Sequence, residues 1–321
     1  MPLADASVVV CSYAMQRWEH LAKAVASIRA QSLRPREIVL VIDHNPDLLA
    51  RAIDSFPDAS VLANSQPRGL SGARNTGIAA AASDVVVFLD DDAAPDEHWL
   101  GRLLTHYGDE SVLGVGGSAE PVWEAARPTW FPEEFDWVVG CSYRGMPTTA
   151  GPVRNLLGCN MSFRRSAFDV AGNFDTGLGR THMGALGGEE TEFCIRLQRI
   201  TPGARLMYDP SAVVAHHVPR TRSTWRYYLS RCYAEGLSKA IVTRRTGIKS
   251  GLETESRYVR STLPRAVWRE VRWAIRRRDG AALLRAGAVL VGLLTTATGY
   301  VVGGARQRIR SPARGSNSGS G

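Results

Sequence analysis

Three consecutive carboxylates, Asp90, Asp91 and Asp92, directly follow the apolar run Val85–Leu89. A short apolar run predicts a buried strand, so the three side chains are delivered together at its carboxyl end. Carboxylate oxygens suit Mg²⁺ and Mn²⁺, and Mg²⁺ commonly combines one or two carboxylates with the phosphates of its ligand. The first hypothesis is therefore a metal-bound diphosphate. The alternative is a solvated acidic loop before a helix that begins near Ala94–Glu97, where the helix dipole favours acidic residues.

Strand-like and helix-like segments alternate along the first part of the chain. We expect strands at Ser7–Tyr13, Glu37–Ile42, Ser60–Ala63 and Asp84–Leu89, and helices over residues 18–28 and 70–82. This order predicts an α/β fold, with a Rossmann-like, mostly parallel sheet and flanking helices. Ligands of such sheets bind at the carboxyl ends of the strands, which would gather Ser12, Asp43 and the acid triplet. Neither GxGxxG nor GxxxxGK[ST] occurs, so dinucleotide-binding and P-loop enzymes lose their main support.

Two further segments bear on the site. Asn64–Gly77 places small residues and two arginines around a predicted helix N-terminus, where amides attract phosphate and Arg74 could reach a diphosphate. The alternative is a glycine-rich loop packed on the sheet, with Arg74 on a solvated face. Residues 120–152 are rich in Trp, Pro and Gly with little periodicity, and we expect a long functional loop or lid there.

Four motifs, taken in order, resemble those of the family 2 glycosyltransferases, which have the GT-A fold. They are Val8–Tyr13 as the opening strand, Arg74–Gly77, Leu89–Asp92 as the DxD-type site, and Gly188–Glu192 near the acceptor side. The resemblance covers roughly residues 5 to 220. It implies an inverting, metal-dependent transfer of a single sugar from a nucleotide sugar, with UDP as the expected nucleotide.

The resemblance also implies roles for individual residues. Asp43 would contact the nucleobase, Asp91 the ribose and Asp92 the metal, with Asp90 supporting the site. The family pattern at the first of these positions usually ends in Asp-Gly-Ser, whereas this chain has Asp43-His44-Asn45. The structural alternative is that Asp43 caps a turn rich in turn-forming residues.

Sugar transfer with inversion needs a carboxylate that removes the proton of the acceptor hydroxyl. Glu190 stands at the family's base position, where Asp is usual, and Glu189 and Glu192 compete for the role. The structural alternative is an acidic first helical turn in which Glu192 pairs with Arg196.

His216 and His217 end an apolar strand, where a family histidine often contacts metal or diphosphate. The match favours His217, and the alternative is a hydrogen-bonded structural histidine. We therefore expect the catalytic base to be Glu190 and the metal ligands to be Asp92 and His217. Substrate contacts are expected from Ser12, Asp43, Arg74, Asp90, Asp91, Asn160 and Glu189.

Positive charge is concentrated in residues 216–321, which hold 21 Lys and Arg against 5 Asp and Glu, whereas residues 1–215 hold 18 against 26. Within the basic part, Ala286–Ala305 lacks any charge and as a helix would be about 30 Å long, enough to span hydrocarbon. Arginines on both sides leave its orientation open. A shallowly inserted or re-entrant helix pair and a helix buried against the catalytic domain are the alternatives.

We expect a GT-A catalytic domain over residues 1–220, a basic helical region over 221–310 and a disordered tail over 311–321. Five scattered cysteines without CxxC argue against a disulfide framework or a zinc knuckle and indicate a reducing compartment. The expected setting is the cytoplasmic face of the cell membrane, with a membrane-associated or single-pass protein beside anionic lipid.

The expected partners are a nucleotide-sugar donor, Mg²⁺ or Mn²⁺, and a glycan acceptor linked to polyprenyl or dolichyl phosphate. Trp130–Trp137 and Gly188–Glu192 are similar to segments of family members that extend lipid-linked glycans, including glucuronosyltransferases acting on glucosyl dolichyl phosphate. One alternative is a nucleotidyltransferase, which would release pyrophosphate. The other is a nucleic-acid-binding protein, but the arginines lack an RRM, zinc-finger or helix-turn-helix context, so no nucleic acid is expected.

Overall fold

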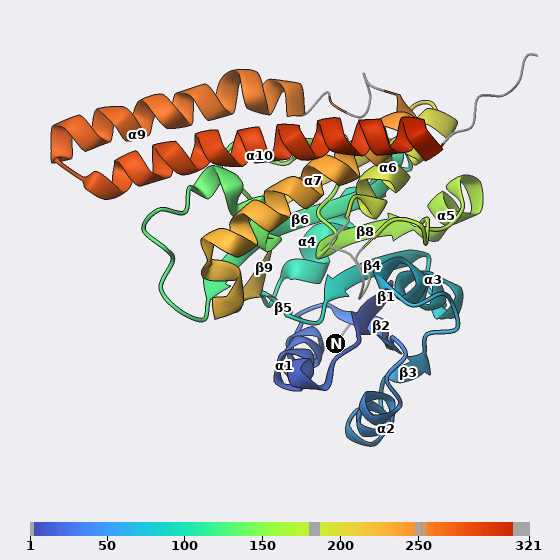
Figure 1. The fold of residues 1–321 in the computed structure, drawn as a ribbon. Coiled ribbons are helices and arrows are strands. Elements are labelled where there is room, and N and C mark those ends of the chain that lie inside the picture. The colour runs from blue at the N-terminus through green and yellow to red at the C-terminus, as the bar shows by residue number, and fades with distance from the viewer. Residues whose placement is uncertain (1–2, 180–186, 248–251, 253–254, 311–321) are drawn as a thin grey trace, which may run out of the picture.

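The computed structural model describes residues 3–179, 187–247, 252 and 255–310. The expected tail over residues 311–321 lies outside these ranges. Figure 1 shows a central sheet with helices on both faces, and two long helices, α9 and α10, lying above α7 at the top of the molecule.

In the part of the chain that the structure describes, nine strands form one sheet in the order β3-β2-β1-β4-β8-β6-β9-β5, with β7 beside β9. The strands are β1 (Leu3–Ser12), β2 (Arg34–Ile42), β3 (Ser60–Ala63), β4 (Val85–Asp90), β5 (Ala93–Pro95), β6 (Val112–Trp123), β7 (Gly151–Pro152), β8 (Asn160–Arg164) and β9 (Arg205–Val218). The α/β class and the strands predicted in the first 90 residues are confirmed.

The sheet is mixed rather than mostly parallel. Among the described residues, β1, β2, β3 and β4 pair in parallel, as do β6 and β9, whereas β8 runs antiparallel to both β4 and β6. Strands β5 and β7 also pair with β9 in antiparallel fashion. The parallel half follows from the alternation of strands and helices, but an apolar run alone carries no information about strand direction.

Helices cover both faces of the sheet because its central strands are apolar on both faces. They are α1 (Trp18–Arg29), α2 (Pro46–Ser55), α3 (Leu70–Ala80), α4 (Trp99–Thr105), α5 (Arg165–Ala171) and α6 (Glu189–Ile200). Val8 and Val10 face one core together with Leu21 and Trp99, whereas Val9 faces the other core together with Phe163. This alternation is the two-residue period of a strand buried on both sides.

The register of the parallel strands sets the position of the polar residues. Cys11 pairs with Asp90 and Ser12 pairs with Ile42, so strands β1, β2 and β4 end level with one another. Ser12, Asp43 and the acid triplet therefore lie at the same edge, as the sequence predicted.

The segment after the acid triplet is a strand, not the helix start that its sequence indicated. Ala93 pairs with His216 and Pro95 with Val214 in the β5–β9 ladder, and α4 begins only at Trp99. The pairing with β9 overrides the local preference of an acidic, proline-containing segment for a helix N-terminus. Its consequence is that the end of β9 is held against the acid triplet.

Within the aromatic segment over residues 120–152, residues 131–141 are mostly buried, whereas residues 142–152 are half-buried or exposed. Strand β6 continues to Trp123, and the short helix η3 (Glu133–Val139) buries Phe135. Phe131 and Phe135 join a third hydrophobic core with Tyr228 and Leu263 from the carboxy-terminal helices. Large aromatic surfaces are stabilised by such burial, which explains a segment without any regular period.

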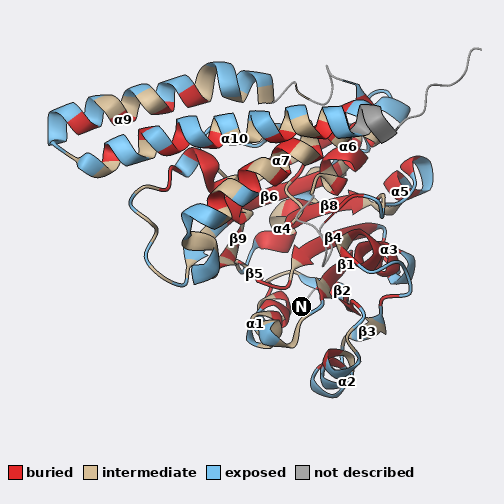
Figure 2. Ribbon diagram, in the orientation of Figure 1, coloured by how far each residue is buried: buried red, intermediate tan, exposed pale blue. Residues whose placement is uncertain are grey.

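The carboxy-terminal part consists of α7 (Trp225–Thr246), α9 (Leu263–Arg277) and α10 (Gly280–Arg310). Among the described residues, α10 is the one helix long and apolar enough to cross a membrane; 28% of its apolar window is buried in the protein. Figure 2 shows exposed residues along the outer sides of α9 and α10, and buried ones toward α7.

Glycines bring α10 and α7 into close contact. A Cβ atom on Gly236 would lie 2.1 Å from the carbonyl oxygen of Thr296, and one on Gly299 would lie 2.2 Å from that of Tyr233. These distances are far below van der Waals contact, so both positions require glycine. Small residues that let two helices approach closely are typical of helix pairs in membranes.

We predict that Gly299→Ala destabilises the carboxy-terminal helices, because the added methyl group forces α10 away from α7. The expected loss is about 1–3 kcal/mol, measured as a lower melting temperature in detergent. Gly287→Ala is the matched control, since a Cβ there meets no atom within 4 Å and should raise helix stability by about 0.5–1 kcal/mol. Equal melting temperatures for the two variants would contradict the packing described.

Candidate active site

The acid triplet is held in place by neighbours from β1 and the loop after it. Ser12 Oγ donates a hydrogen bond to Asp91 Oδ2 (2.6 Å). Arg17 Nη2 lies 2.5 Å from Asp91 Oδ1 and 2.6 Å from Asp92 Oδ2. Burial raises the pKa of Asp91 to about 7, although Arg17 and Ser12 act to lower it. Arg17 is thus the main counter-ion of the triplet.

Asp90, Asp92 and His216 form a group that fits a divalent cation. One possible ligand atom from each lies within 4.8 Å of the others. The two oxygens of Asp92 face different neighbours, since Oδ2 lies beside Arg17 whereas Oδ1 lies 3.4 Å from His216 Nε2. Two carboxylates suit Mn²⁺ or Mg²⁺, and the imidazole nitrogen adds a third possible ligand, so these residues fit the expected metal.

The geometry favours His216 over the predicted His217 as the metal ligand. His216 is 1% exposed beside Asp92, whereas the ring of His217 stacks on His20 with centroids 4.0 Å apart. Successive side chains of a strand point to opposite faces, and the pairing of His216 with Ala93 directs the earlier histidine toward the triplet. His217 contributes through its backbone, whose N–H donates to the carbonyl oxygen of Asp92 (2.8 Å).

Asp43 organises the loop that precedes α3. It accepts hydrogen bonds from Asn64 Nδ2 at Oδ1 (2.6 Å) and from the Gly69 N–H at Oδ2 (3.0 Å). It does not cap α2, because the cap is Asn45, whose Oδ1 accepts from the Leu48 N–H. Asp43 is therefore a fixed carboxylate at the strand-end edge.

Arg74 is a buried cation that links several elements. Nη1 donates to Glu189 Oε1 (2.9 Å), and Nη2 donates to the carbonyl oxygen of Gly158 (2.8 Å) and lies 3.4 Å from Asp90 Oδ1. The side chain does not lie on a solvated face, because it is only 2% exposed. Arg74 therefore positions Asp90 and Glu189 relative to one another.

Glu189 and Glu190 differ in their surroundings. The carboxylate of Glu189 is paired with Arg74, whereas Glu190 borders the cavity without an ion pair among the described residues. Burial raises the pKa of Glu190 to about 8, and the negative charge of Glu189 adds to this effect. A carboxyl with a pKa near neutrality is suited to general base catalysis. Glu192 is excluded as a competitor because it pairs with Arg196 (2.9 Å).

Asn160 does not face the substrate, contrary to the prediction. It is completely buried, its Oδ1 accepts from Trp99 Nε1 (2.8 Å), and its Nδ2 donates to the carbonyl oxygens of Ser118 (2.8 Å) and Ala212 (2.9 Å). These bonds use both amide protons and the carbonyl oxygen. Asn160 instead ties β8 to β6, β9 and α4.

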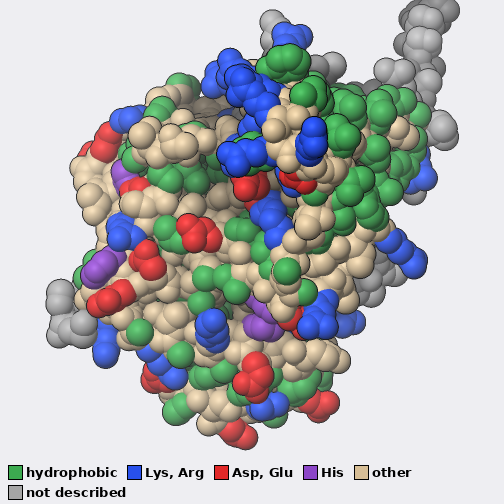
Figure 3. All heavy atoms as spheres, turned by 90° about the vertical axis from the view of Figure 1, so that its left-hand side faces the viewer, with side chains coloured by type: hydrophobic (Ala, Val, Ile, Leu, Met, Phe, Trp, Pro, Cys, Tyr) green, Lys and Arg blue, Asp and Glu red, His purple; other side chains and the backbone are tan. Residues whose placement is uncertain are grey.

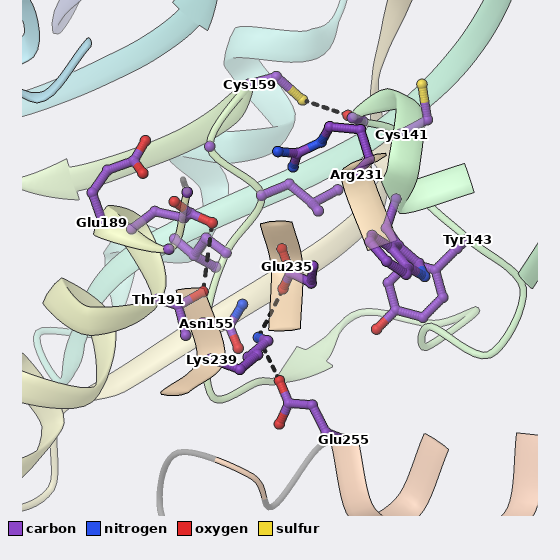
Figure 4. Close-up of a pocket in the computed structure, with 18 of the residues that line it drawn as sticks. Cys141, Tyr143, Asn155, Cys159, Glu189, Thr191, Arg231, Glu235, Lys239 and Glu255 are labelled. Carbon is purple, nitrogen blue, oxygen red and sulfur yellow. Dashed lines mark hydrogen bonds and ion pairs between the residues drawn. The ribbon is translucent and has the colours of Figure 1, made fainter. Parts of the chain in front are cut away.

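One cavity of about 270 Å³ is bordered by part of this group, namely Arg74, Asp90, Glu189, Glu190 and His216. The cavity lies between the acid triplet, the start of α6 and one face of α7. The residues that line it there are Asp90, Arg74 and His216, then Glu189 and Glu190 of α6, and Arg231, Glu235 and Lys239 of α7. Figure 4 shows Glu189 and Thr191 on α6 on one side, with Lys239 and Glu235 opposite them. Figure 3 shows a hollow on the side of the molecule that carries acidic and basic side chains.

Sequence reasoning missed the cations around the triplet. Arg17 ends the short 3₁₀ helix Met15–Arg17 after β1, and Arg222, whose Nη2 is 3.7 Å from Asp92 Oδ2, lies more than 100 residues along the chain from Asp92. No local pattern marks either residue. The charged side chains of α7 were detectable, because Arg231, Glu235 and Lys239 recur every fourth residue and so share one helix face.

Comparison with known proteins assigns the family. The model of the family described as "Glycosyl transferase family 2" matches residues 7–172. The chain belongs to glycosyl transferase family 2. This family 2 enzyme is a glycosyltransferase, and the resemblance inferred from its motifs is confirmed.

A curated relative is the glucosyl-dolichyl phosphate glucuronosyltransferase of Haloferax volcanii, 36% identical over 240 residues, which are 74% of this chain and 76% of the relative. Among solved structures, the mannosyltransferase PcManGT from Pyrobaculum calidifontis, in complex with GDP-Man and Mn²⁺, is similar with a TM-score of 0.58 at 19% identity. That match covers 95% of this chain and 87% of the other. GalNAc-T7 with UDP, GalNAc and Mn²⁺ matches with a TM-score of 0.50 at 18% identity, over 76% and 51% of the two chains. These likenesses confirm the GT-A fold.

We predict that His216 and His217 differ in their effect on metal affinity. His216→Ala should weaken Mn²⁺ binding in the presence of UDP about tenfold or more, because it removes a proposed ligand, whereas His217→Ala should change it less than about threefold. Calorimetric titration of Mn²⁺ measures both. The reverse ranking would restore the sequence-based choice of His217.

Proposed function

We propose that this enzyme moves one sugar, with inversion, from a UDP-sugar to a glycan acceptor linked to polyprenyl or dolichyl phosphate, using Mg²⁺ or Mn²⁺. The observation that carries the proposal is the single cavity bordered by both Asp90 and Glu190. A donor and an acceptor must meet in one place for direct transfer, and this cavity offers an acidic end and a base. The glucuronosyltransferase relative, named for a dolichyl phosphate substrate, supports the lipid-linked acceptor.

The donor would bind along the edge where β1, β2 and β4 end. Asp43 would contact the nucleobase and Asp91, oriented by Ser12 and Arg17, the ribose. Asp90, Asp92 and His216 would hold the cation. A bound divalent cation neutralises charge that develops on the leaving diphosphate. The solved relatives with UDP or GDP-Man and Mn²⁺ support this arrangement.

The acceptor hydroxyl would be activated by Glu190. Its carboxylate takes the hydroxyl proton while the acceptor oxygen forms a bond to the anomeric carbon and the bond to the diphosphate oxygen breaks. One displacement of this kind inverts the anomeric configuration. Arg74 would support the step indirectly, because its ion pair with Glu189 fixes the start of α6, where Glu190 lies.

The carboxy-terminal helices would contact the membrane. Helix α10 turns its small residues inward, including Ala286, Gly299 and Gly303, whereas Leu290 and Leu294 are at least half exposed. Soluble proteins bury their large apolar side chains, so this arrangement favours an apolar environment outside the helix pair. Exposed apolar side chains of the pair, shown in part in Figure 3, are Trp268, Trp273, Ile275, Leu283, Leu284, Leu290, Val291, Leu294 and Val301.

The cytoplasmic face of the membrane is the setting that fits the positive charge of the carboxy-terminal helices and the free cysteines. All five cysteines are free, as a reducing compartment requires. Arginines near the turn between α9 and α10, including Arg276 and Arg277, would face an anionic lipid surface.

We predict a pH profile governed by Glu190. Since the base acts when deprotonated, kcat/KM should rise about tenfold per pH unit below pH 8 and level off above it. Glu190→Gln should lower kcat by about 100-fold or more and remove this dependence. Glu19→Gln, an exposed position on α1, is the control and should leave both unchanged. A Glu190→Gln enzyme with normal kcat would rule out this base.

A donor screen tests the function itself. Full-length protein in detergent is incubated with Mn²⁺ or Mg²⁺, a panel of nucleotide sugars and a membrane lipid extract, and nucleoside diphosphate and lipid-bound sugar are measured. We expect one UDP-sugar to give both products only with metal, and the new bond to have the inverted configuration by NMR. Release of pyrophosphate, or a retained configuration, would contradict the proposal.

A further inference from the structure

A basic group in the cavity remains outside the donor and base assignments. Lys239 of α7 and Arg154, which precedes β8, line the same cavity as Glu190. Both bind one carboxylate, that of Glu255: Arg154 Nη1 and Nη2 lie 2.7 and 2.8 Å from its two oxygens, and Lys239 Nζ lies 2.6 Å from Oε1. A planar guanidinium and an ammonium converging on two oxygens form a ready-made site for an oxyanion.

The oxyanion site is enclosed, and Lys239 Nζ also lies 3.3 Å from Glu235 Oε1, so two cations face two carboxylates there. The side chains of Arg154 and Lys239 are 11% and 16% exposed, so water screens their charges little. Burial opposes ionisation of Glu255, yet Lys239 and Arg154 lower its pKa to about 2. Arg154 and Lys239 therefore stabilise a negative charge at the position of the Glu255 carboxylate.

Apolar side chains continue the cavity beyond the oxyanion site. Val259 and Leu263, four and eight residues after Glu255, line it together with Leu293 and Thr296 of α10. The same α10 segment exposes Leu290 and Leu294 on its outer side. In Figure 4, Lys239 lies between the α6 residues Glu189 and Thr191 on one side and Glu255 on the other. A base, a cationic pair and an apolar wall thus border one space.

We propose that Arg154 and Lys239 bind the phosphodiester of the lipid-linked acceptor, and that the carboxylate of Glu255 occupies this position until the phosphate displaces it. A lipid-linked sugar presents a hydroxyl, a phosphate and a hydrocarbon chain in that order. The cavity presents Glu190, the Arg154–Lys239 pair and the apolar side chains of Val259, Leu263 and Leu293. This inference rests on the proposed function. It specifies that the enzyme recognises the phosphodiester of the acceptor.

Two acceptors, one with and one without a phosphodiester, show whether Lys239 recognises the phosphate or only stabilises the fold. The probes are citronellyl phosphate carrying glucose, which contains a phosphodiester, and citronellyl glucoside, which lacks it. The full-length enzyme in detergent is used with the donor found in the screen, and KM is measured for each acceptor and for the donor. Lys239→Met should raise KM for the phosphodiester acceptor about tenfold or more, with KM for the glucoside and the donor within about twofold of wild type.

Glu255→Gln should change KM for the phosphodiester acceptor in the opposite direction. Removing the competing carboxylate should lower KM for the phosphodiester acceptor several-fold, whereas an ion pair needed only for structure would make both variants worse. Lys23→Met, an exposed position on α1, is the control for the same chemical change and should leave all constants unchanged. Melting temperatures verify that the variants are folded.

Three outcomes would overturn the assignment. They are equal increases in KM for both acceptors, an increase confined to the donor, which would assign the pair to the donor diphosphate, and loss of activity in both Lys239→Met and Glu255→Gln. Failure of the wild-type enzyme to use either acceptor, with any donor, would instead overturn the proposed function on which this inference rests.

Discussion

The buried guanidinium of Arg74 is the constraint on which the geometry of the site depends. It holds Asp90 at the end of β4, Glu189 at the start of α6 and the carbonyl oxygen of Gly158 before β8. Removing one partner of a buried ion pair typically costs about 3–5 kcal/mol, because the other charge is left unpaired. The three elements therefore stay together, and the acidic end of the cavity keeps a fixed position relative to Glu190.

The second half of the sheet and the carboxy-terminal helices form the remaining walls of the cavity that Arg74 and its partners border. Strand β5 pairs with β9 and so holds His216 beside Asp92, and Asn160 fixes β8 between its neighbours. Helix α7 then adds Lys239 from the opposite wall. Since α10 packs on α7 through Gly299, the apolar outer surface and the polar cavity belong to one connected structure.

Local sequence patterns predicted the parts of the fold that depend on local physics. The apolar run Val85–Leu89 predicted a central strand, and the level ends of parallel strands placed Ser12 and Asp43 beside the acids. Strand direction, the β5 pairing and the burial of the aromatic segment depend on contacts between distant residues, so no local period reveals them. The same limit explains the choice of His217 over His216, because the pairing with β5 decides which histidine faces Asp92. Arg17 was missed for a related reason, since only the folded chain brings its loop onto the triplet.

We propose that the metal and the leaving nucleotide occupy the end of the cavity where Arg74 pairs with Asp90 and Glu189. Anomalous diffraction from crystals of the full chain with UDP and Mn²⁺ would locate both. We expect one manganese peak among Asp90, Asp92 and His216, with the diphosphate in the cavity that Glu190 borders. A manganese peak beside His217 on the other face of β9, or a nucleotide bound outside this cavity, would contradict it.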